Sequence, residues 1–388
     1  MMNKIKKAVI VPDSFKGTMS SSEICEIIDK AFKKIMPDVK TVKIPIADGG
    51  EGTVDAVLYA SGGEKIFVKS KNPLFEDIDS FYGILQSEKS KNFKKTAVIE
   101  MAAASGLPLI ENRKNPLDAS TFGTGLLIKD ALDKGCEKII LGLGGSATND
   151  GGAGVAAALG MKFFDEHNLE IIPSNRGLEK LKYIDSSGLD KRLKNCEFIV
   201  ACDVDNILCG PTGASYIFGP QKGADEETVR ILDANLSKYA NILYEKTGIE
   251  IRNIPKIGAA GGILATFLSF PDFMNCEIYS GIDIILDTAG FDDIIKDADL
   301  IITGEGKFDS QSLNGKAVSG IAKRAKKQNK SVIIIAGGAR EYDDKIYDLG
   351  ISAVFSACSG LYANFDELKQ LCFEDLYKTA ENILRIII

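Results

Sequence analysis

The 388-residue sequence contains one histidine, no tryptophan and no pair of cysteines spaced as C-x-x-C. The single histidine, His167, lies in DEHNLE between two apolar runs, which predicts a solvated hairpin turn. A histidine triad or a histidine-ligated metal therefore has almost no support, and acid–base chemistry falls to Asp, Glu or Lys. The eight scattered cysteines indicate reduced thiols, because a chain of this length needs neither a disulfide framework nor a structural zinc site.

Neither an excess of basic residues nor a long apolar run occurs. Acidic side chains outnumber basic ones, 54 against 47, which gives a net charge of −7. This balance disfavours broad binding to nucleic acid or anionic membranes, so any phosphate site is local and its ligand small. The apolar run from Ala8 stops at Pro12, too early for a signal-peptide core, and no later run approaches membrane-spanning length. We expect a cytoplasmic protein that binds neither nucleic acid nor membranes.

Two familiar nucleotide-binding motifs are absent as well. The pair Gly306-Lys307 is followed by Phe308 rather than Ser or Thr, and Gly315-Lys316 lacks the upstream glycine of a P-loop. The catalytic loop of protein kinases is also missing. Any nucleotide site in this chain therefore belongs to another class.

The most informative segment present is residues 141–154, LGLGGSATNDGGAG, which carries six glycines, two hydroxyl side chains, one amide and one acid. It follows an apolar strand and precedes an apolar helix. Glycine has no Cβ to hold a ligand away, so backbone N–H groups can close on phosphate oxygens while the helix start adds its positive dipole end. The alternative is a tight turn that serves packing alone. Phosphate binding is our working hypothesis because similar turns accompany this one.

Both chain ends show alternating strands and helices. Two strands at one end cannot bury both faces of a parallel sheet, whereas two plus three make a five-stranded doubly wound sheet. We therefore predict an α/β domain built from residues 1–68 plus 289–388, with helices on both faces of its sheet. Its expected strands are residues 7–11, 41–46, 300–303, 332–336 and 353–356; its expected helices are one opened by the capping box Ser20-Ser21-Ser22-Glu23, another through residues 54–58, and others near 316–328, 343–349 and from 365 onward.

Residues 69–288 predict a second α/β domain inserted in the first. The segment begins with hairpin-like alternation around Asn72-Pro73. Further strands are expected at residues 97–101, 138–143 and 197–201, and helices at 123–134 and 226–246. We expect the active site in the cleft between the two domains.

Five polar turns that contain glycine or acids sit at the ends of expected strands. Open α/β sheets bind ligands at the carboxyl ends of their strands, so turns remote in sequence can converge on one site. Their content matches phosphoryl transfer, which needs glycines and helix N-termini around phosphates, a lysine, carboxylates for Mg²⁺, and a carboxylate to accept the proton of an alcohol. The turns are residues 12–17, 48–53, 142–154, 203–206 and 303–309.

The tripeptide Gly-Glu-Gly occurs twice, at residues 50–52 and 304–306. A carboxylate beside a polyphosphate repels it unless a divalent cation lies between them or the acid faces the acceptor's hydroxyls. The repeated acids therefore imply magnesium.

Each of these residues also has a simpler interpretation. Lys16 fits a solvated turn lysine, and an Asp before a helix most often caps it. Residues 121–124 can simply start a helix, GAAGG at 258–262 can be a close-packing device, and Cys202 can be a buried core thiol. The cap interpretation applies to Asp13, Asp48, Asp150 and Asp309.

Taken together, the segments resemble the bacterial type-1 glycerate kinase family, which phosphorylates D-glycerate from ATP. The resemblance runs in order from residue 11 to residue 316. Departures are small: Asn175-Arg176-Gly177 stands where the family often has paired glycines, and Asn206-Ile207 where Asn-Pro is usual. The segments are VPDSFKGTMSSSE, ADGGEGTVDA, VIEMAAASGL, TFGTGLLIKDALDKG, LGGSATNDGGAG, ACDVDN, LCGPTGAS, FGPQKGA, GAAGG and ITGEGKFDSQSLNGK.

The resemblance implies a flavodoxin-like domain with an unusual α/β domain inserted in it, which matches the split sheet inferred from the pattern. It also implies ATP and Mg²⁺ as cofactors, D-glycerate as the acceptor and 2-phosphoglycerate as the product. The sequence leaves open which hydroxyl is phosphorylated, the stereochemical preference and the oligomeric state, with a homodimer as one option.

The residue roles are our own assignments. Backbone N–H groups and hydroxyls of two glycine loops are expected to hold the ATP phosphates, and Lys16 and Lys307 to neutralise the transferred group and anchor the carboxylate of glycerate. Asp150 is the preferred general base because it lies inside the glycine loop. The catalytic candidates are Asp150, Lys16, Asp48 and Asp309; the cofactor-binding candidates are Gly144, Gly145, Ser146, Thr148, Asn149, Gly151, Gly304, Gly306 and Lys307; the substrate-binding candidates are Ser14, Lys16, Gly49, Gly50 and Glu51; and the metal ligands are Asp203 and Glu305.

Two other functions remain open at this point. The chain could phosphorylate the other hydroxyl, giving 3-phosphoglycerate, or act on another small hydroxy acid or a polyol. A non-catalytic sensor of a phosphorylated metabolite could use the same cradle, but it has no need of paired Gly-Glu-Gly turns and additional aspartates.

Overall fold

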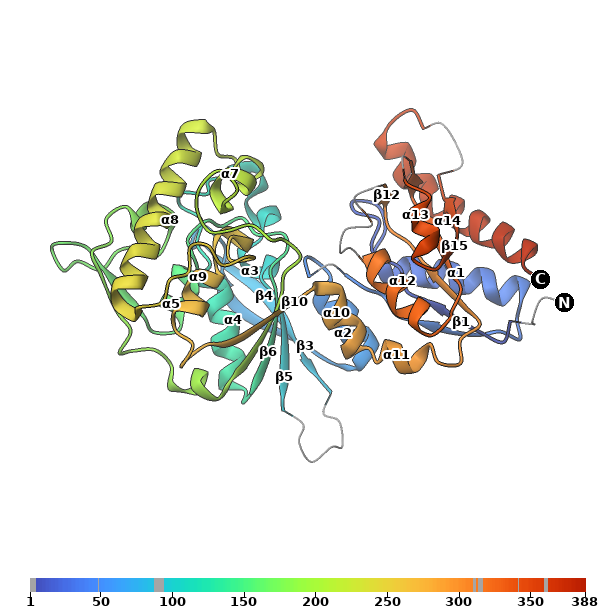
Figure 1. Ribbon diagram of the computed structural model, residues 1–388, viewed down its shortest axis with the longest axis horizontal. Coiled ribbons are helices and arrows are strands. Elements are labelled where there is room, and N and C mark those ends of the chain that lie inside the picture. Colours follow the sequence, from blue (N-terminus) through green and yellow to red (C-terminus); the bar gives the residue numbers. More distant parts are fainter. Residues whose placement is uncertain are drawn as a thin grey trace. The chain divides into compact units, whose positions relative to one another are not determined.

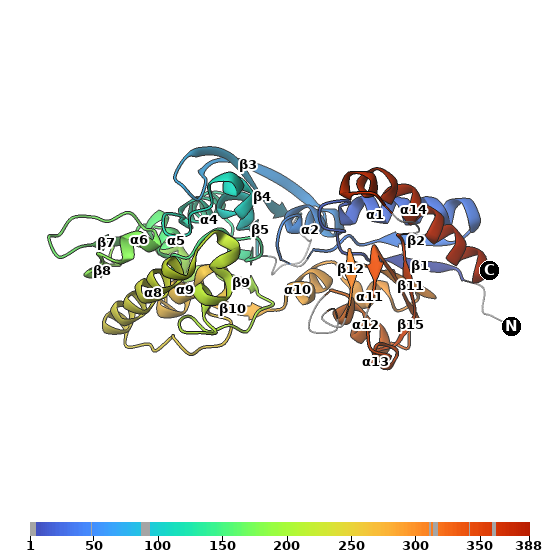
Figure 2. The same ribbon diagram turned by 90° about the horizontal axis from the view of Figure 1, so that it is seen from above.

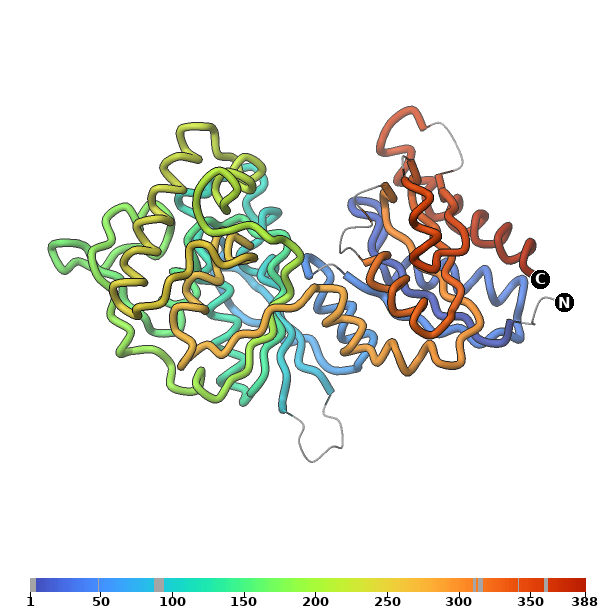
Figure 3. Tube along the Cα trace, in the orientation of Figure 1, coloured from blue at the N-terminus to red at the C-terminus, as the bar shows by residue number. Residues whose placement is uncertain are grey.

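The computed structural model describes residues 5–47, 49–86, 94–309, 312, 317–340, 342–358 and 362–388. The chain forms two compact units (Figure 1). Unit 1 comprises Met1–Asp48, Asp55–Gly62 and Ser280–Ile388, and unit 2 comprises Gly49–Val54 and Gly63–Tyr279. Both chain ends therefore build the same unit, as the blue and red segments of the trace show (Figure 3).

Unit 1 contains a parallel five-stranded sheet in the order β15-β13-β11-β1-β2. This is the flavodoxin-like order, in which the first strand of the chain lies between the second and the third. The predicted doubly wound sheet built from both chain ends is confirmed. Its strands are β1 (Lys7–Ile10), β2 (Lys40–Lys43), β11 (Leu300–Thr303), β13 (Val332–Ala336) and β15 (Ile351–Ser356).

Helices cover both faces of this sheet (Figure 2). Strand β13, VIIIA, is buried along its length, as expected for a strand covered on both sides. Ile333 and Ile335 pack in one cluster with α1 and α14, whereas Ile334 and Ala336 pack in another with α12 and α13. The helices of unit 1 are α1 (Ser21–Ile35), α2 (Thr53–Ser61), α10 (Gly281–Thr288), α11 (Phe291–Ile294), α12 (Ala317–Lys327), α13 (Lys345–Asp348) and α14 (Phe365–Ile386), and a small sheet joins β12 (Lys307–Phe308) to β14 (Gly338–Ala339).

The first helix begins where the sequence predicts. The Ser20 side chain accepts from the Glu23 amide at 3.3 Å, and the Glu23 carboxylate accepts from the Ser20 amide at 2.8 Å. This reciprocal capping box satisfies two backbone N–H groups that otherwise lack partners at a helix start.

Unit 2 contains a six-stranded sheet in the order β10-β9-β6-β5-β4-β3. Strands β5, β6, β9 and β10 are parallel, and β3 and β4 form an antiparallel hairpin at one edge. The strands are β3 (Gly63–Lys71), β4 (Asp77–Leu85), β5 (Thr96–Glu100), β6 (Lys138–Gly142), β9 (Glu197–Ala201) and β10 (Asn275–Tyr279), with β7 (Lys162–Phe164) and β8 (Tyr183–Asp185) pairing separately.

The core of unit 2 is one large apolar cluster between this sheet and its helices. Helix α8 (Glu226–Thr247) contributes Leu236, Tyr239, Ala240 and Leu243, spaced as one face of a helix. The other helices are α3 (Ala102–Ser105), α4 (Phe122–Asp133), α5 (Ala153–Ala158), α6 (Asn175–Leu178), α7 (Ala214–Phe218) and α9 (Leu264–Ser269), with short 3₁₀ helices η1 (Leu107–Arg113), η2 (Lys191–Asn195), η3 (Pro220–Lys222) and η4 (Ala259–Gly261).

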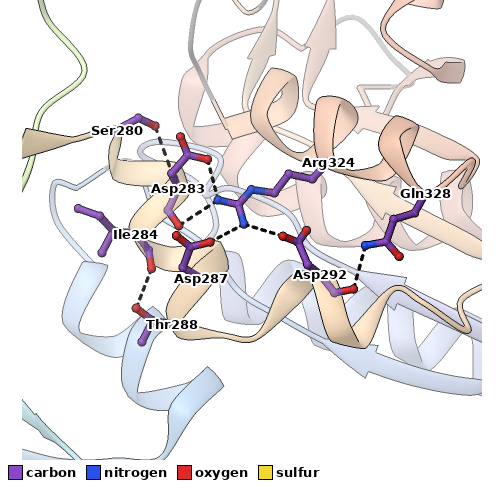
Figure 4. A network of polar contacts seen from close by, with 8 residues as sticks. All are labelled: Ser280, Asp283, Ile284, Asp287, Thr288, Asp292, Arg324 and Gln328. Carbon is purple, nitrogen blue, oxygen red and sulfur yellow. Dashed lines mark hydrogen bonds and ion pairs between the residues drawn. The ribbon is translucent and has the colours of Figure 1, made fainter.

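The unit boundaries differ from the expected 1–68 plus 289–388 and 69–288. Residues 63–68 belong to unit 2 because β3 pairs with β4 along its whole length, from Gly63 opposite Leu85 onward. Helix α10 belongs to unit 1, where Arg324 of α12 donates to the carboxylates of Asp283 at 2.8 Å and Asp287 at 2.5 Å (Figure 4).

The remaining expectations about chain-wide chemistry concern His167, the cysteines and membranes. His167 is exposed in a tight turn between Phe164 and Glu170, which pair as an isolated bridge. All eight cysteines are free. Among the described residues, no helix is long and apolar enough to cross a membrane.

Candidate functional site

The glycine loop, residues 143–152, connects the carboxyl end of β6 to α5. Its outer part is accessible: Gly145 is exposed and Gly144 and Ser146 are partly exposed, whereas residues 147–152 are buried. Gly145 and Gly152 have φ values of +74° and +84°, which residues with a Cβ rarely adopt. The loop therefore presents backbone and one hydroxyl to solvent at its tip and fixes the rest of its length in the core.

The turn after Asp48 packs directly on this loop. The amide of Gly144 donates to Gly49 O at 3.0 Å, and a Cβ on Gly144 would lie 2.6 Å from the Cα of Gly50. Val54, at the start of α2, donates its amide to the buried carboxylate of Glu100 at 3.1 Å. The structure thus brings the substrate-binding candidates Gly49 and Gly50 against the cofactor-binding loop, and the adjacent Glu51 is exposed.

Asp203 lies on the same edge of the unit 2 sheet. It follows β9, the neighbour of β6, so its backbone leaves the sheet beside the glycine loop. A Cβ on Gly49 would approach the Cβ of Ala201 to 3.2 Å, so the turn at Gly49 also contacts the end of β9. Asp203 is exposed.

Asp150 is fully buried, and its carboxylate accepts several bonds from the protein. The donors are Thr121 through its amide at 2.7 Å and its hydroxyl at 2.8 Å, and the amides of Gly152 at 3.2 Å and Gly154 at 3.1 Å. Burial raises the pKa of Asp150, and these bonds oppose that rise. Asp150 ties the start of α4 to the start of α5, which favours a structural role over the expected role of general base.

The same bonds explain the segment TFGTG at the start of α4. Thr121 is the residue that caps α4, and its hydroxyl also accepts from the Val155 amide at 2.9 Å. The helix-start interpretation of this segment therefore accounts for what the structure shows. The GAAGG segment at residues 258–262 contacts the buried part of the glycine loop, because the Gly151 amide donates to Gly261 O at 3.0 Å.

Asn149 is held by a chain of buried amides. Its side-chain oxygen accepts from Asn175 at 3.2 Å and from the Ser215 hydroxyl at 3.1 Å, and Asn235 donates to the Asn175 side chain at 3.0 Å. The segment Asn175-Arg176-Gly177, which departs from the family pattern, therefore supplies a partner for Asn149. The Asn149 side-chain nitrogen has no hydrogen-bond partner among the described residues.

Lys222 is a residue of this site that sequence reasoning missed. It ends η3 and is 2% exposed. Its ammonium donates to Ser146 Oγ at 3.0 Å and to Thr148 O at 2.7 Å. Burial lowers the pKa of Lys222 to about 7, and the charge of Asp150 opposes that shift. The motif FGPQKGA was visible in the sequence, but nothing local indicates that its lysine reaches a loop more than seventy residues away.

A second set of candidates gathers at the carboxyl edge of the unit 1 sheet. The amide of Asp13 donates to Gly304 O at 2.8 Å, and a Cβ on Gly306 would lie 3.2 Å from the Cα of Phe15 and 3.4 Å from the nitrogen of Lys16. The turns after β1 and β11 are therefore in contact. They carry Ser14, Lys16, Glu305, Lys307 and Asp309.

Lys307 and Asp309 form an ion pair of 2.9 Å at this edge. Lys307 is 76% exposed and Asp309 20% exposed, so the lysine can turn to a ligand while the carboxylate stays beside the protein. Asp48, the remaining catalytic candidate, lies outside the described residues.

The predicted site residues thus fall into two sets, one at the carboxyl edge of each sheet. Unit 2 carries Gly49, Gly50, Glu51, Gly144, Gly145, Ser146, Thr148, Asn149, Asp150, Gly151 and Asp203; unit 1 carries Ser14, Lys16, Gly304, Glu305, Gly306, Lys307 and Asp309. Glycine loops with hydroxyls and acids at such edges are typical of ligand-binding proteins of the α/β class.

Comparison with known proteins identifies the family. The model of the "Glycerate kinase family" matches residues 8–388. A "Glycerate kinase" of Haemophilus influenzae is 46% identical over 98% of both chains, and a "Glycerate 2-kinase" of Escherichia coli is 44% identical over 97% of both. The crystal structure of a putative glycerate kinase 2 from Salmonella typhimurium LT2 superposes with a TM-score of 0.84 at 41% identity, covering 99% of this chain and 98% of that one.

The chain belongs to the glycerate kinase family. It is an enzyme, a phosphotransferase that acts on a small molecule, and its family implies ATP as the phosphate donor. The resemblance inferred from the motifs is confirmed. Membership in a kinase family leaves the non-catalytic sensor without support.

Proposed function

We propose that this enzyme transfers the terminal phosphoryl group of ATP to the 2-hydroxyl of D-glycerate. The observation that carries the proposal is the match along nearly the whole chain to glycerate kinases, among them the E. coli relative named for the 2-position. The glycine loop supports it, because a solvent-facing tip of backbone and hydroxyl groups suits an anion.

In this proposal the residues of unit 2 hold ATP. The tip at Gly144, Gly145 and Ser146 offers backbone N–H groups and one hydroxyl to the phosphates, while buried residues behind it keep its shape. Close packing also holds the loop in this shape, since a Cβ on Gly144 would lie 2.6 Å from the Cα of Gly50. Preformed donors of this kind stabilise charge that develops in the transition state without reorganising.

The residues of unit 1 bind and activate the acceptor. Lys16 and Lys307 bind the carboxylate of glycerate and the transferred group, and Asp309 takes the proton of the attacking hydroxyl. Asp309 fits this role better than Asp150 because it is partly exposed and adjacent to a lysine, whereas the Asp150 carboxylate is occupied by Thr121 and two loop amides. An ionised acid within reach of the hydroxyl is the minimum requirement of a general base.

Magnesium would be held mainly by ATP itself. Within the described residues, no group of three or more acidic, cysteine or histidine side chains could hold a metal ion. Mg²⁺ commonly takes only one or two carboxylates together with substrate phosphates and water. Exposed Asp203 suits such a single ligand, and we keep Glu305 as the candidate on unit 1. When bound, the ion would offset the negative charge of the phosphates.

A panel assay tests the reaction. ADP release is measured by a coupled assay with ATP and magnesium chloride against D-glycerate, L-glycerate, lactate, serine and glycerol. We expect release with D-glycerate only, and phosphorus NMR of the product should show 2-phosphoglycerate. A 3-phosphoglycerate signal would move the reaction to the other hydroxyl, release with another acid would change the substrate, and no release with any acceptor would refute the proposal.

Location and oligomeric state are the subjects of two further proposals. We propose that the enzyme works in the cytoplasm, which fractionation of cells that express it from its own promoter would test. We also propose a homodimer, for which light scattering of the eluted protein should give twice the chain mass of 41.8 kDa.

A further inference from the structure

The buried lysine beneath the glycine loop has no counter-ion paired with it among the described residues. Lys222 is 2% exposed, and its two hydrogen bonds go to a hydroxyl and a carbonyl, both uncharged. Within the described part of the chain it makes no ion pair. Burying an ammonium without a paired anion is costly, and an apolar side chain of similar size generally fits such a position with less penalty. A purely structural role therefore explains a lysine at position 222 poorly.

Asp150 does not serve as that counter-ion. It is the charged group whose field acts on Lys222, but the two form no ion pair, and the Asp150 carboxylate is bonded to Thr121, Gly152 and Gly154.

The lysine also fixes the direction of the Ser146 hydroxyl. In its charged form Lys222 can only donate, so Ser146 Oγ then accepts from it. The Ser146 hydroxyl donates to no described residue, and Ser146 is partly exposed at the loop tip. Its hydrogen is therefore free to point outward as a donor to a ligand.

We propose that Lys222 is a positioning residue of the phosphate site: its buried ammonium orients Ser146 and the loop tip, and the ATP phosphates supply its missing counter-charge. This inference rests on the proposed binding of ATP at the glycine loop. It adds a role for a lysine that never has to touch the ligand, because the field of a buried charge is screened much less than that of an exposed one.

Two substitutions distinguish this positioning role from a purely structural role. Lys222→Met keeps the volume and removes both charge and hydrogen bonds, and Lys222→Gln keeps a donor without the charge. Affinity is measured by calorimetry with the ATP analogue AMP-PNP and magnesium chloride, and stability of the free protein by thermal unfolding. Lys182→Met, at an exposed lysine of unit 2, is the matched control.

We expect both Lys222 variants to bind the analogue at least about tenfold more weakly, because they remove a buried charge that the phosphates would compensate. Their melting temperatures should equal or exceed that of the wild type, since an uncompensated buried charge is removed. The control should match the wild type in both. The proposal would be overturned if Lys222→Gln bound the analogue as well as the wild type. It would also be overturned if the variants had a lower melting temperature and unchanged affinity, because Lys222 would then have only a structural role.

Proton uptake gives a second measurement that needs only Lys222→Gln and the wild type. The pKa of Lys222 is about 7 in the free protein, so binding of an anion should raise it and draw in about half a proton at pH 7. Calorimetry in two buffers of different ionisation enthalpy measures this uptake. Equal uptake by the two proteins would overturn the proposal.

The design separates this failure from failure of the proposed function. If the wild type itself does not bind AMP-PNP, ATP binding at the loop is wrong and the inference falls with it. If the wild type binds and all Lys222 variants bind equally well, only the inference about Lys222 is wrong.

Discussion

Burial decides what the charged side chains of this enzyme can do. Asp150 and Asp309 are both acids in glycine-bearing loops, and the sequence favoured Asp150 as the base. The structure surrounds Asp150 with donors and leaves Asp309 partly exposed beside Lys307. An acid that already accepts bonds from the protein is stabilised as a structural acceptor, while an accessible one can exchange its partner for a substrate.

This difference predicts opposite phenotypes for two matched substitutions. Asp150→Asn turns one acceptor oxygen into a donor, which then faces the Gly152 amide in place of Oδ1 or the Thr121 and Gly154 amides in place of Oδ2. We expect it to lower the free energy of unfolding by about 2–4 kcal/mol, because buried donors lose their partner. Urea unfolding measures this loss, and Asp272→Asn, at an exposed position, is the control. A stable Asp150→Asn protein with strongly reduced kcat would restore Asp150 as the base.

Asp309→Asn should instead reduce turnover and spare the fold. Loss of a general base commonly costs about a hundredfold or more in rate, so kcat should fall by at least that factor while the melting temperature stays close to wild type. Steady-state kinetics with ATP and D-glycerate measure the effect. A kcat within threefold of the wild type would rule out Asp309 as the base.

The buried Lys222 predicts a stability that depends on pH. Its pKa is lowered from 10.5 to about 7, so between these values the unfolded chain binds a proton that the folded chain does not. Stability therefore rises with pH across this window, by on the order of 5 kcal/mol for this group. Comparison of wild type with Lys222→Met by urea unfolding at pH 6.5 and pH 9 isolates the effect. The advantage of the variant should shrink at pH 9, and a gap that does not change with pH would contradict the prediction.

At the scale of elements, the loops depend on close backbone approach. Gly144 and Gly50 come from turns far apart in sequence, and a Cβ on Gly144 would lie 2.6 Å from the Cα of Gly50. This contact holds the turn at Gly49 against the glycine loop.

Gly144→Ala should push these two turns apart. We expect at least a tenfold fall in kcat/KM for ATP, because a small displacement of positioning groups is costly in catalysis. Gly135→Ala is the control, since Gly135 has a positive φ of 77° but no atom near its Cβ position. That control should lose about 1 kcal/mol of stability and keep its kinetics. Equal kinetic loss in both variants would mean that general destabilisation is the cause.

Another element-scale contact fixes helix α10, which starts directly after the chain enters unit 1. Arg324 of α12 donates to Asp283, Asp287 and, at 3.3 Å, Asp292 (Figure 4). The arginine is 14% exposed and its partners are more exposed, so the network is partly screened.

Arg324→Ala should lower the melting temperature through loss of this network, by about 1–2 kcal/mol in the free energy of unfolding. Arg324→Lys should recover only part of it, because a lysine cannot reproduce the planar fork of donors. Thermal unfolding measures both, with Arg385→Ala as an exposed control. If Arg324→Lys had the melting temperature of the wild type, the positive charge of Arg324 alone would account for its effect.

At the scale of the whole molecule, the two sets of site residues raise a conformational prediction. Phosphoryl transfer must keep water away from the transferred group, and two-domain enzymes commonly close to do so. We propose that binding of ATP and the acceptor makes the enzyme more compact. Small-angle scattering with AMP-PNP and D-glycerate should give a smaller radius of gyration than the free enzyme. Identical profiles would count against closure.

Much of the fold follows from local patterns. The buried strand β13 and the capping box of α1 were predicted closely, because hydrophobic periodicity and helix-start chemistry act over a few residues. The unit boundaries differ from the predicted ones because they depend on contacts between segments far apart in the chain. Strand β3 pairs with β4, and Arg324 binds α10.

The sequence by itself determined the order of elements and the family, because hydrophobic pattern and motif order are properties of the chain. Only the tertiary structure decided which acids are buried, that Lys222 lies under Ser146, and which turns touch. The physical reason is that burial and pairing come from contacts between residues far apart along the chain, which no local pattern specifies.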